Sequence, residues 1–441
     1  MRKSLSLLLL LVAAAGSAGA QSAPIDPARA ARYFEEARSL SAADGGRLWG
    51  VALYGPMIFV IPATREVVAN QADAEGKLTQ HGPVWTGTLP EEVNAANTSL
   101  EWAGVHWTMI MWPLPIYPRE RAALMMHECF HRVQAQLELP ARNLVNSQLD
   151  TREGRIWLEL EWRALESALV NFDKPERRVG ALTDALLFRT WRRKLYPGSA
   201  EKEDGLEMNE GLAEYTGERL ASATMAEMRE AAIGTLRSGP KRRSFARSFA
   251  YVTGPAYGAL LDSAPGSQGE WRKGLKPDSD FGWLANRAYH VLLGTPTERA
   301  AISAGRRYDA EELIARETER EERRRAIVTA ARARFVDPPS LRLPVTKDFG
   351  YSFDPNNVVS LDDNLTLYTP IKVSDEWGVL ECPKGAVLVQ EKGLIVGAQI
   401  PAPADPAARP LVLDGCTLEL HEGWTLAPGD RAGDFLLKPK P

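Results

Sequence analysis

The sequence contains few cysteines and histidines, and no long apolar run after its first residues. Its 441 residues include three cysteines and six histidines, and the formal net charge is only -4. This small acidic excess gives no electrostatic reason to expect nucleic acid as a partner. After Ala20, no segment stays apolar for the roughly 18 residues that a membrane span needs, so stable membrane insertion is not expected. What is present, 44% apolar and 25% charged residues, is typical of a soluble globular protein.

The first twenty residues, MRKSLSLLLLLVAAAGSAGA, have the pattern of a secretion signal. Basic Arg2 and Lys3 precede an apolar run, and small residues Ala18 and Ala20 frame a cleavage site. We therefore expect a signal peptide at residues 1–20 and an exported protein, either periplasmic or secreted.

Three cysteines leave at least one unpaired in an exported protein. Cys382 and Cys416 both lie in the C-terminal part and could form a bridge, although the sequence does not determine their separation. Cys129 lies within an apolar helical segment, which indicates a buried core thiol.

The order of the expected elements indicates an α+β fold. Residues 21–117 read as mainly β, because segments such as VHWTMIMW are rich in aromatic and β-branched residues. Helical patterns dominate residues 118–337, and the segment VDPPS then ends helix formation. Residues 341–441 alternate short apolar runs with Gly, Pro and Asn, which predicts a separate C-terminal all-β domain.

The segment LMMHECFHRVQAQL, residues 124–137, carries two histidines four residues apart. Pro118 and Pro140 mark the ends of a helix predicted over about residues 118–137. At 100° per residue its apolar side chains share one face, and His127, Glu128 and His131 share another, which we expect to line a cleft.

The H-E-x-x-H spacing is typical of a zinc site. Two imidazoles one helical turn apart hold Zn²⁺, and the glutamate beside the first takes a proton from a metal-bound water. His127 and His131 are therefore the predicted zinc ligands, and Glu128 is the predicted general base. A pair of hydrogen-bonded structural histidines is the alternative.

A catalytic zinc site also needs a third protein ligand and an open fourth position. Two later segments offer carboxylates, LELEWRALESAL with Glu159, Glu161 and Glu166, and GLEMNEGLAEYTG with Glu207, Glu210, Glu214 and Glu218. On a helix the second set stacks at spacings of three and four, where like charges repel by about a few tenths of a kcal/mol per pair. A cation would relieve this repulsion, and so would pairing with Arg219 and other basic residues.

The motif HECFH followed by NEGLAEY resembles the gluzincin metallopeptidases, the thermolysin-like and aminopeptidase-N-like group. The resemblance implies a zincin-like catalytic region, in which Glu210 is the third zinc ligand and Glu214 accepts from the outer N–H of a zinc-bound histidine. In those families the third ligand follows the second histidine closely, whereas Glu210 lies 79 residues after His131. The interval must therefore hold an additional helical insertion. The GxMEN stretch of the aminopeptidases, which captures a free α-amine, has no equivalent here.

The stretch YVTG, from Tyr251 to Gly254, is similar to the YxxG stretch of aminopeptidase-N-like enzymes. The resemblance implies that Tyr251 stabilises the oxyanion, and Tyr215 and Tyr257 are the rival candidates. The ring of Pro255 clashes with the carbonyl of Tyr251, so a helix kink is expected there.

Together these patterns predict an exported zinc metallopeptidase that hydrolyses a peptide or protein substrate. VHWTMIMW is expected to be an edge strand beside the cleft, where an extended peptide could pair with it. The alternatives are a zinc hydrolase of a non-peptide amide or ester, and a zinc-containing binding protein without turnover. No pattern identifies a protein partner for the C-terminal domain.

Overall fold

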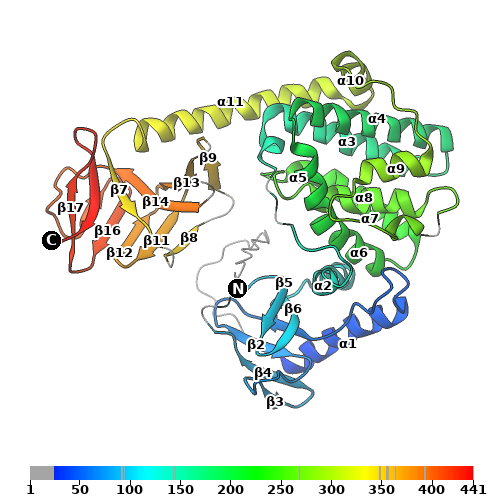
Figure 1. Cartoon of the computed structure of the whole chain (residues 1–441), viewed down its shortest axis with the longest axis horizontal. Coiled ribbons are helices and arrows are strands. Elements are labelled where there is room, and N and C mark those ends of the chain that lie inside the picture. The colour runs from blue at the N-terminus through cyan, green and yellow to red at the C-terminus, as the bar shows by residue number, and fades with distance from the viewer. Residues whose placement is uncertain are drawn as a thin grey trace. The chain divides into compact units, whose positions relative to one another are not determined.

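The computed structural model describes residues 24–440, apart from residues 91–92, 94, 143, 145, 268, 347–348, 354–356, 363 and 392–393. The expected signal peptide, residues 1–20, lies outside the described residues. The described chain is α+β, with an N-terminal sheet, a helical middle and a C-terminal all-β region (Figure 1). None of the described helices has the length and apolar character needed to cross a membrane.

The chain divides into two compact units after Glu317. This boundary lies inside helix α11 (Ala310–Phe335), earlier than the boundary expected at residues 337–341. The last turns of α11 bury Ala331 and Phe335 against Leu367 and Val387 of the C-terminal region. Hydrophobic packing therefore assigns the end of α11 to the second unit, which the helical periodicity alone does not reveal.

The N-terminal region begins with a helix that the expected mainly β region did not include. In α1 (Pro27–Asp44), the Asp26 side chain accepts a hydrogen bond from Ala28 N, and Gly45 ends the helix with a φ of 61°. The strands that follow are β1 (Met57–Val60), β2 (Glu66–Ala69), β3 (Thr79–His81), β4 (Val84–Thr88), β5 (Thr98–Trp102) and β6 (Val105–Met111). They form a sheet in the order β3-β4-β2-β1-β6-β5, in which β1 and β6 are parallel.

The segment VHWTMIM forms β6, which lies between β1 and β5. Among the described strands, β5 is the edge strand on this side, and both β5 and β6 pack against α2 (Pro118–Val133) (Figure 1). The expectation that this segment is an edge strand is therefore wrong. Its apolar side chains reflect burial, since Trp107, Met109 and Ile110 are fully buried within the sheet.

Helices fill the middle of the chain around one large apolar core. They are α2, α3 (Arg152–Val170), α4 (Pro175–Leu195), α5 (Ser199–Leu206), α6 (Leu212–Ala221), α7 (Met225–Ser238), α8 (Ala250–Asp262), α9 (Phe281–Tyr289) and α10 (Glu298–Gly305). A π-helical turn, Glu207–Gly211, connects α5 to α6. Helices α3 and α4 pack against each other between His131 and Glu210, so this interval holds helices as expected.

In the second unit, strands form two sheets with an apolar core that includes Leu341, Trp377 and Leu388. One sheet has the order β17-β18-β7-β14-β13-β10-β9, and the other has the order β15-β16-β12-β11-β8. The strands are β7 (Ser340–Pro344), β8 (Gly350–Phe353), β9 (Val358–Ser360), β10 (Leu365–Tyr368), β11 (Ile371–Asp375), β12 (Gly378–Cys382), β13 (Ala386–Glu391), β14 (Leu394–Pro401), β15 (Leu411–Leu413), β16 (Cys416–Leu420), β17 (Trp424–Pro428) and β18 (Phe435–Pro439). A disulfide joins Cys382 to Cys416, the pairing that the sequence left open. Cys129 is a buried free thiol.

Candidate metal centre

Helix α2 carries the two histidines on a face that other helices cover. The helix begins at Pro118, in the first-turn position that suits proline, and ends at Val133, four residues before the expected end. His127 is 3% exposed and Glu128 is completely buried. The face was expected to line a cleft, and in the structure it is largely buried, with α6 packed against α2. His131, Glu214 and the nearby Tyr251 are partly exposed.

Three side chains converge on one point. His127 Nε2 lies 3.1 Å from His131 Nε2, and Glu210 Oε2 lies 3.6 Å from the first nitrogen and 3.4 Å from the second. The predicted ligands His127, His131 and Glu210 thus form a nearly equilateral triangle of two nitrogens and one oxygen, although Glu210 lies 79 positions after His131 in the sequence.

The triangle has the dimensions of a zinc site. A tetrahedral Zn²⁺ with ligand bonds of about 2.0–2.1 Å separates its ligand atoms by about 3.3–3.4 Å. The three observed separations lie around this value. Two imidazoles and one carboxylate are also a donor set that catalytic zinc sites use, with a fourth position left for water or substrate. The residues therefore fit a zinc ion.

Glu210 reaches the histidines from the π-helical turn. Such single turns insert an extra residue into a helix and occur often at functional sites. A close helix contact accompanies the turn, because a Cβ atom at Gly254 would lie 2.2 Å from the carbonyl oxygen of Gly211. Gly254 is the glycine of YVTG, so this motif brings α8 directly against the turn that holds Glu210.

Each histidine has a partner for its outer nitrogen. His127 Nδ1 lies 2.8 Å from Glu214 Oε2, and His131 Nδ1 lies 2.9 Å from Gln134 Oε1. Hydrogen bonds of this kind fix the ring orientation and leave Nε2 free to bind a metal. The structure therefore brings Glu214 to the position that the resemblance implied, and it adds Gln134, which the sequence reading missed.

Gln134 also connects His131 to Glu210, the predicted third ligand. Its Nε2 donates to Asn209 Oδ1 at 3.0 Å, and Asn209 Nδ2 donates to Glu210 Oε1 at 3.3 Å. The chain from His131 through Gln134 and Asn209 to Glu210 joins the end of α2 to the π-helical turn. The sequence held a signal for both amides, because Gln134 follows His131 by three residues and Asn209 directly precedes Glu210.

Glu128 is a fully buried carboxylate beside the two histidines. Among the described residues, neither of its oxygens has a hydrogen-bond partner, and Oε1 lies 4.0 Å from His127 Nε2. Burial raises the pKa of Glu128 above its usual value. A desolvated carboxylate beside a metal site has the properties of a general base, since it gains a proton readily.

Tyr251 lies directly over the cluster. Its ring stacks on His127 with 5.6 Å between centroids, and its hydroxyl donates to Glu210 Oε2 at 2.6 Å. The rival tyrosines have other partners, because Tyr257 donates to Glu161 and Tyr215 donates to Asp262. Among the three candidates, Tyr251 is the one whose hydroxyl faces the predicted metal ligands.

The charges around the triangle favour a cation. Burial acts to lower the pKa of His127, but the carboxylates of Glu210 and Glu214 hold it well above its usual value. Burial acts to raise the pKa of Glu210, but His127 and His131 hold it well below its usual range. The carboxylates therefore stabilise positive charge at the two imidazoles, and a divalent ion would supply that charge in place of protons.

The other candidate carboxylates are paired with arginine. Glu207 bonds to Arg189, and Glu218 bonds to Arg119. The carboxylates on α3 likewise have arginine partners, with Glu159 bonded to Arg316, Glu161 to Arg189 and Arg192, and Glu166 to Arg237. Of the glutamates considered as third ligand, Glu210 is the one whose carboxylate faces the Nε2 atoms of both histidines, whereas Glu214 contacts the outer nitrogen of His127.

A second carboxylate group, Asp204, Glu207 and Asp280, has spacing that a metal would also accept. Its centre holds the guanidinium of Arg189, which contacts Glu207 at 2.5 Å, Asp280 at 2.9 Å and Asp204 at 3.2 Å. The arginine already fills the role of the cation there, so we assign this group to a buried ion network.

Comparison with known proteins identifies no relative, since models of protein families, curated proteins and solved structures all lack a match to this chain.

Proposed function

We propose that this protein is an exported zinc-dependent peptidase with a gluzincin-like catalytic site. His127, His131 and Glu210 would hold the ion, with Glu214 and Gln134 orienting the two imidazoles. The convergence of two Nε2 atoms and one carboxylate oxygen within 3.1–3.6 Å is the observation that carries the proposal. The protein would be a hydrolase of peptide or protein substrates.

Zinc in such a site supplies a Lewis acid that polarises the scissile carbonyl and acidifies water. Glu128 takes a proton from the attacking water and passes it to the leaving nitrogen, a role that suits its desolvated carboxylate, which accepts no hydrogen bond from the described residues. Tyr251 donates its hydroxyl to the oxyanion that develops on the carbonyl, a contribution of about 3 kcal/mol for comparable donors.

The burial of Glu128 beside the ligand triangle, with no hydrogen bond from the described residues, favours catalysis over a purely structural metal. A buried carboxylate without partners costs stability, and a structural site gains nothing from it. A zinc-containing binding protein would have no use for an unpaired base beside its metal. This argument favours turnover over the non-catalytic alternative.

Peptide is the proposed substrate because strand β5 offers a free edge beside α2. Among the described strands it pairs with β6 alone, so its outer edge has backbone groups that an extended peptide can use. The Cys382–Cys416 disulfide supports export, since such bonds persist in oxidising compartments.

The test is cleavage of a mixed library of dye-labelled peptides by the full chain. Cleavage should disappear after chelation and return on addition of zinc, because the proposed site needs the ion. If the zinc-loaded protein hydrolyses esters or non-peptide amides and leaves all peptides intact, the substrate assignment is wrong. If it turns over none of these substrates, the enzymatic proposal fails.

A further inference from the structure

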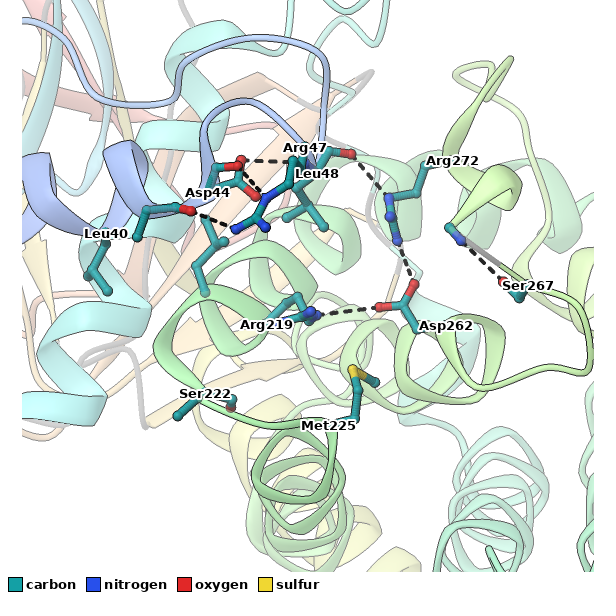
Figure 2. A pocket seen from close by; sticks show the side chains of 14 residues that line it. Leu40, Asp44, Arg47, Leu48, Arg219, Ser222, Met225, Asp262, Ser267 and Arg272 are labelled. Carbon is teal, nitrogen blue, oxygen red and sulfur yellow. Dashed lines mark hydrogen bonds and ion pairs between the residues drawn. The ribbon is translucent and has the colours of Figure 1, made fainter.

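A pocket of about 590 Å³ lies where the C-terminal ends of α1, α6 and α8 meet (Figure 2). The residues that line it do not include the metal-binding cluster. Arg47 lies in the turn after α1, Arg219 lies in the last turn of α6, and Arg272 follows α8. Three arginines thus reach one space from three separate segments.

Asp262, the last residue of α8, accepts hydrogen bonds from three side chains. Its Oδ1 accepts from Trp271 Nε1 at 2.8 Å and from Arg272 Nη1 at 2.5 Å. Its Oδ2 accepts from the Tyr215 hydroxyl at 2.7 Å. Arg272 also donates to the carbonyl of Leu48 at 3.1 Å. Asp262 and Arg272 therefore neutralise each other.

Arg219 retains spare donors. Among the described residues its one polar contact joins Nε to Asp262 Oδ2 at 3.7 Å, which is too long for a hydrogen bond, and its side chain is 33% exposed. Arg47 donates to the carbonyls of Ala43 and Asp44, which have no net charge. In the described lining, three guanidinium groups therefore face two carboxylates, those of Asp44 and Asp262, and one positive charge is uncompensated.

The remaining wall is largely apolar. Leu40, Leu48, Leu220 and Met225 line the pocket beside the arginines. Its volume is within the roughly 300–1,000 Å³ of pockets that bind organic molecules, and a bare inorganic anion would leave most of it unfilled.

We infer that this pocket binds a small organic anion that has one carboxylate and an apolar body. The carboxylate would lie against the free guanidinium edge of Arg219, which is shaped for a two-point contact. The apolar body would lie along Leu40, Leu220 and Met225. A single negative charge matches the single uncompensated positive charge. This site does not depend on the metal centre.

The inference is tested by calorimetric titration of the full chain with hexanoate, hexanamide and inorganic phosphate. The protein is first freed of metal by chelation and dialysis, so that a carboxylate cannot bind through zinc. Hexanoate should bind saturably, and hexanamide should bind at least about tenfold more weakly because it lacks the charge. Binding of phosphate without binding of hexanoate would overturn the assignment of an organic anion.

Variants locate the binding. Arg219→Gln should weaken hexanoate binding at least about tenfold, whereas Arg219→Lys keeps the charge and should lose less. The matched control is Arg237→Gln, because Arg237 is an exposed arginine that pairs with Glu166 outside the pocket. Melting curves confirm that each variant is folded, which is expected for Arg219 because it makes no hydrogen bond among the described residues. Equal hexanoate affinity in the folded Arg219→Gln variant and the parent protein would overturn the inference.

Discussion

The hydroxyl of Tyr251 donates a 2.6 Å hydrogen bond to Glu210 Oε2, the same oxygen that faces both histidines. Glu210 lies on the π-helical turn and Tyr251 lies on α8, and the close contact of Gly254 with Gly211 brings these elements together. The hydroxyl therefore lies next to the predicted ion, at a place where it can reach an oxygen bound there.

Tyr251→Phe should reduce kcat about a hundredfold with KM little changed, as for other single oxyanion donors. The phenyl ring preserves the stacking on His127, so zinc content should stay at the level of the parent protein. Steady-state kinetics and metal analysis of the same sample check both statements. If the Tyr251→Phe variant loses its zinc, the oxyanion role is contradicted, because the hydroxyl would then act by holding Glu210 in place.

Tyr257→Phe is the matched control for this variant. The Tyr257 hydroxyl is buried and donates to Glu161, so its removal should lower stability by about 1–3 kcal/mol and leave kcat nearly unchanged. A reversed outcome, with activity lost in Tyr257→Phe and kept in Tyr251→Phe, would move the oxyanion role to Tyr257.

Gln134→Leu should weaken zinc binding by about 10–100-fold, the usual effect of losing an outer partner of a metal ligand. The change removes the acceptor of His131 and breaks the link to Asn209. Gln134→Glu keeps the acceptor and should lose less affinity. Competition with a chromophoric chelator measures the zinc dissociation constants of both variants. If the two variants bind zinc as tightly as the parent protein, Gln134 does not orient the ligand.

The ligand set shows what the sequence could and could not predict. His127, Glu128 and His131 share one short helix, so their juxtaposition followed from helical geometry. Glu210 came from a resemblance, because no local rule connects residues that are 79 positions apart. The partner of His131 was missed, although Gln134 follows His131 by three residues within the segment predicted as helix.

The fold was predictable at the level of its regions and less so in its details. Apolar alternation indicated strands, but it did not distinguish the interior strand β6 from the edge strand β5. Likewise, the proline signals at residues 336–340 marked the end of α11, yet its last turns belong to the second unit. Strand order and helix docking depend on contacts between distant residues, which periodicity does not contain.

Glu128→Gln should lower the rate of hydrolysis about 10²–10⁴-fold, while the zinc content stays unchanged. The amide has the size of the carboxylate but cannot accept the proton, and Glu128 is not one of the three converging ligands. Turnover and zinc content measured on one preparation test this expectation. A zinc-replete Glu128→Gln variant with full turnover would exclude the proposed mechanism.

As pH rises from 5 to 7, the free energy of unfolding should fall less in the Asp204→Asn variant than in the parent protein. Burial, together with the charges of Asp280 and Glu207, raises the pKa of Asp204 to about 7 despite Arg193 and Arg189. The folded protein then holds a proton that the unfolded chain releases near pH 4, so stability falls across this window by up to about 1.4 kcal/mol per pH unit.

Calorimetric Tm values at pH 5, 6 and 7 measure this effect, with the metal removed so that zinc does not contribute. The Tm of the Asp204→Asn variant should fall less than that of the parent protein, because the amide has no proton to lose. Asp173→Asn is the control, since Asp173 is exposed, and it should keep the parental slope. If Tm falls equally with pH in all three proteins, Asp204 is not the group that holds the proton.

The central claim is that His127, His131 and Glu210 together bind zinc, and metal analysis of purified protein tests it most directly. The parent protein and Glu166→Ala should each contain one zinc per chain, because Glu166 pairs with Arg237 and does not face the histidines. Glu210→Ala should lose most of its zinc, because two histidines alone make an incomplete site. Circular dichroism establishes that this variant is folded. A folded Glu210→Ala variant with the full zinc content, or a parent protein that binds no zinc when the metal is supplied, would contradict the account.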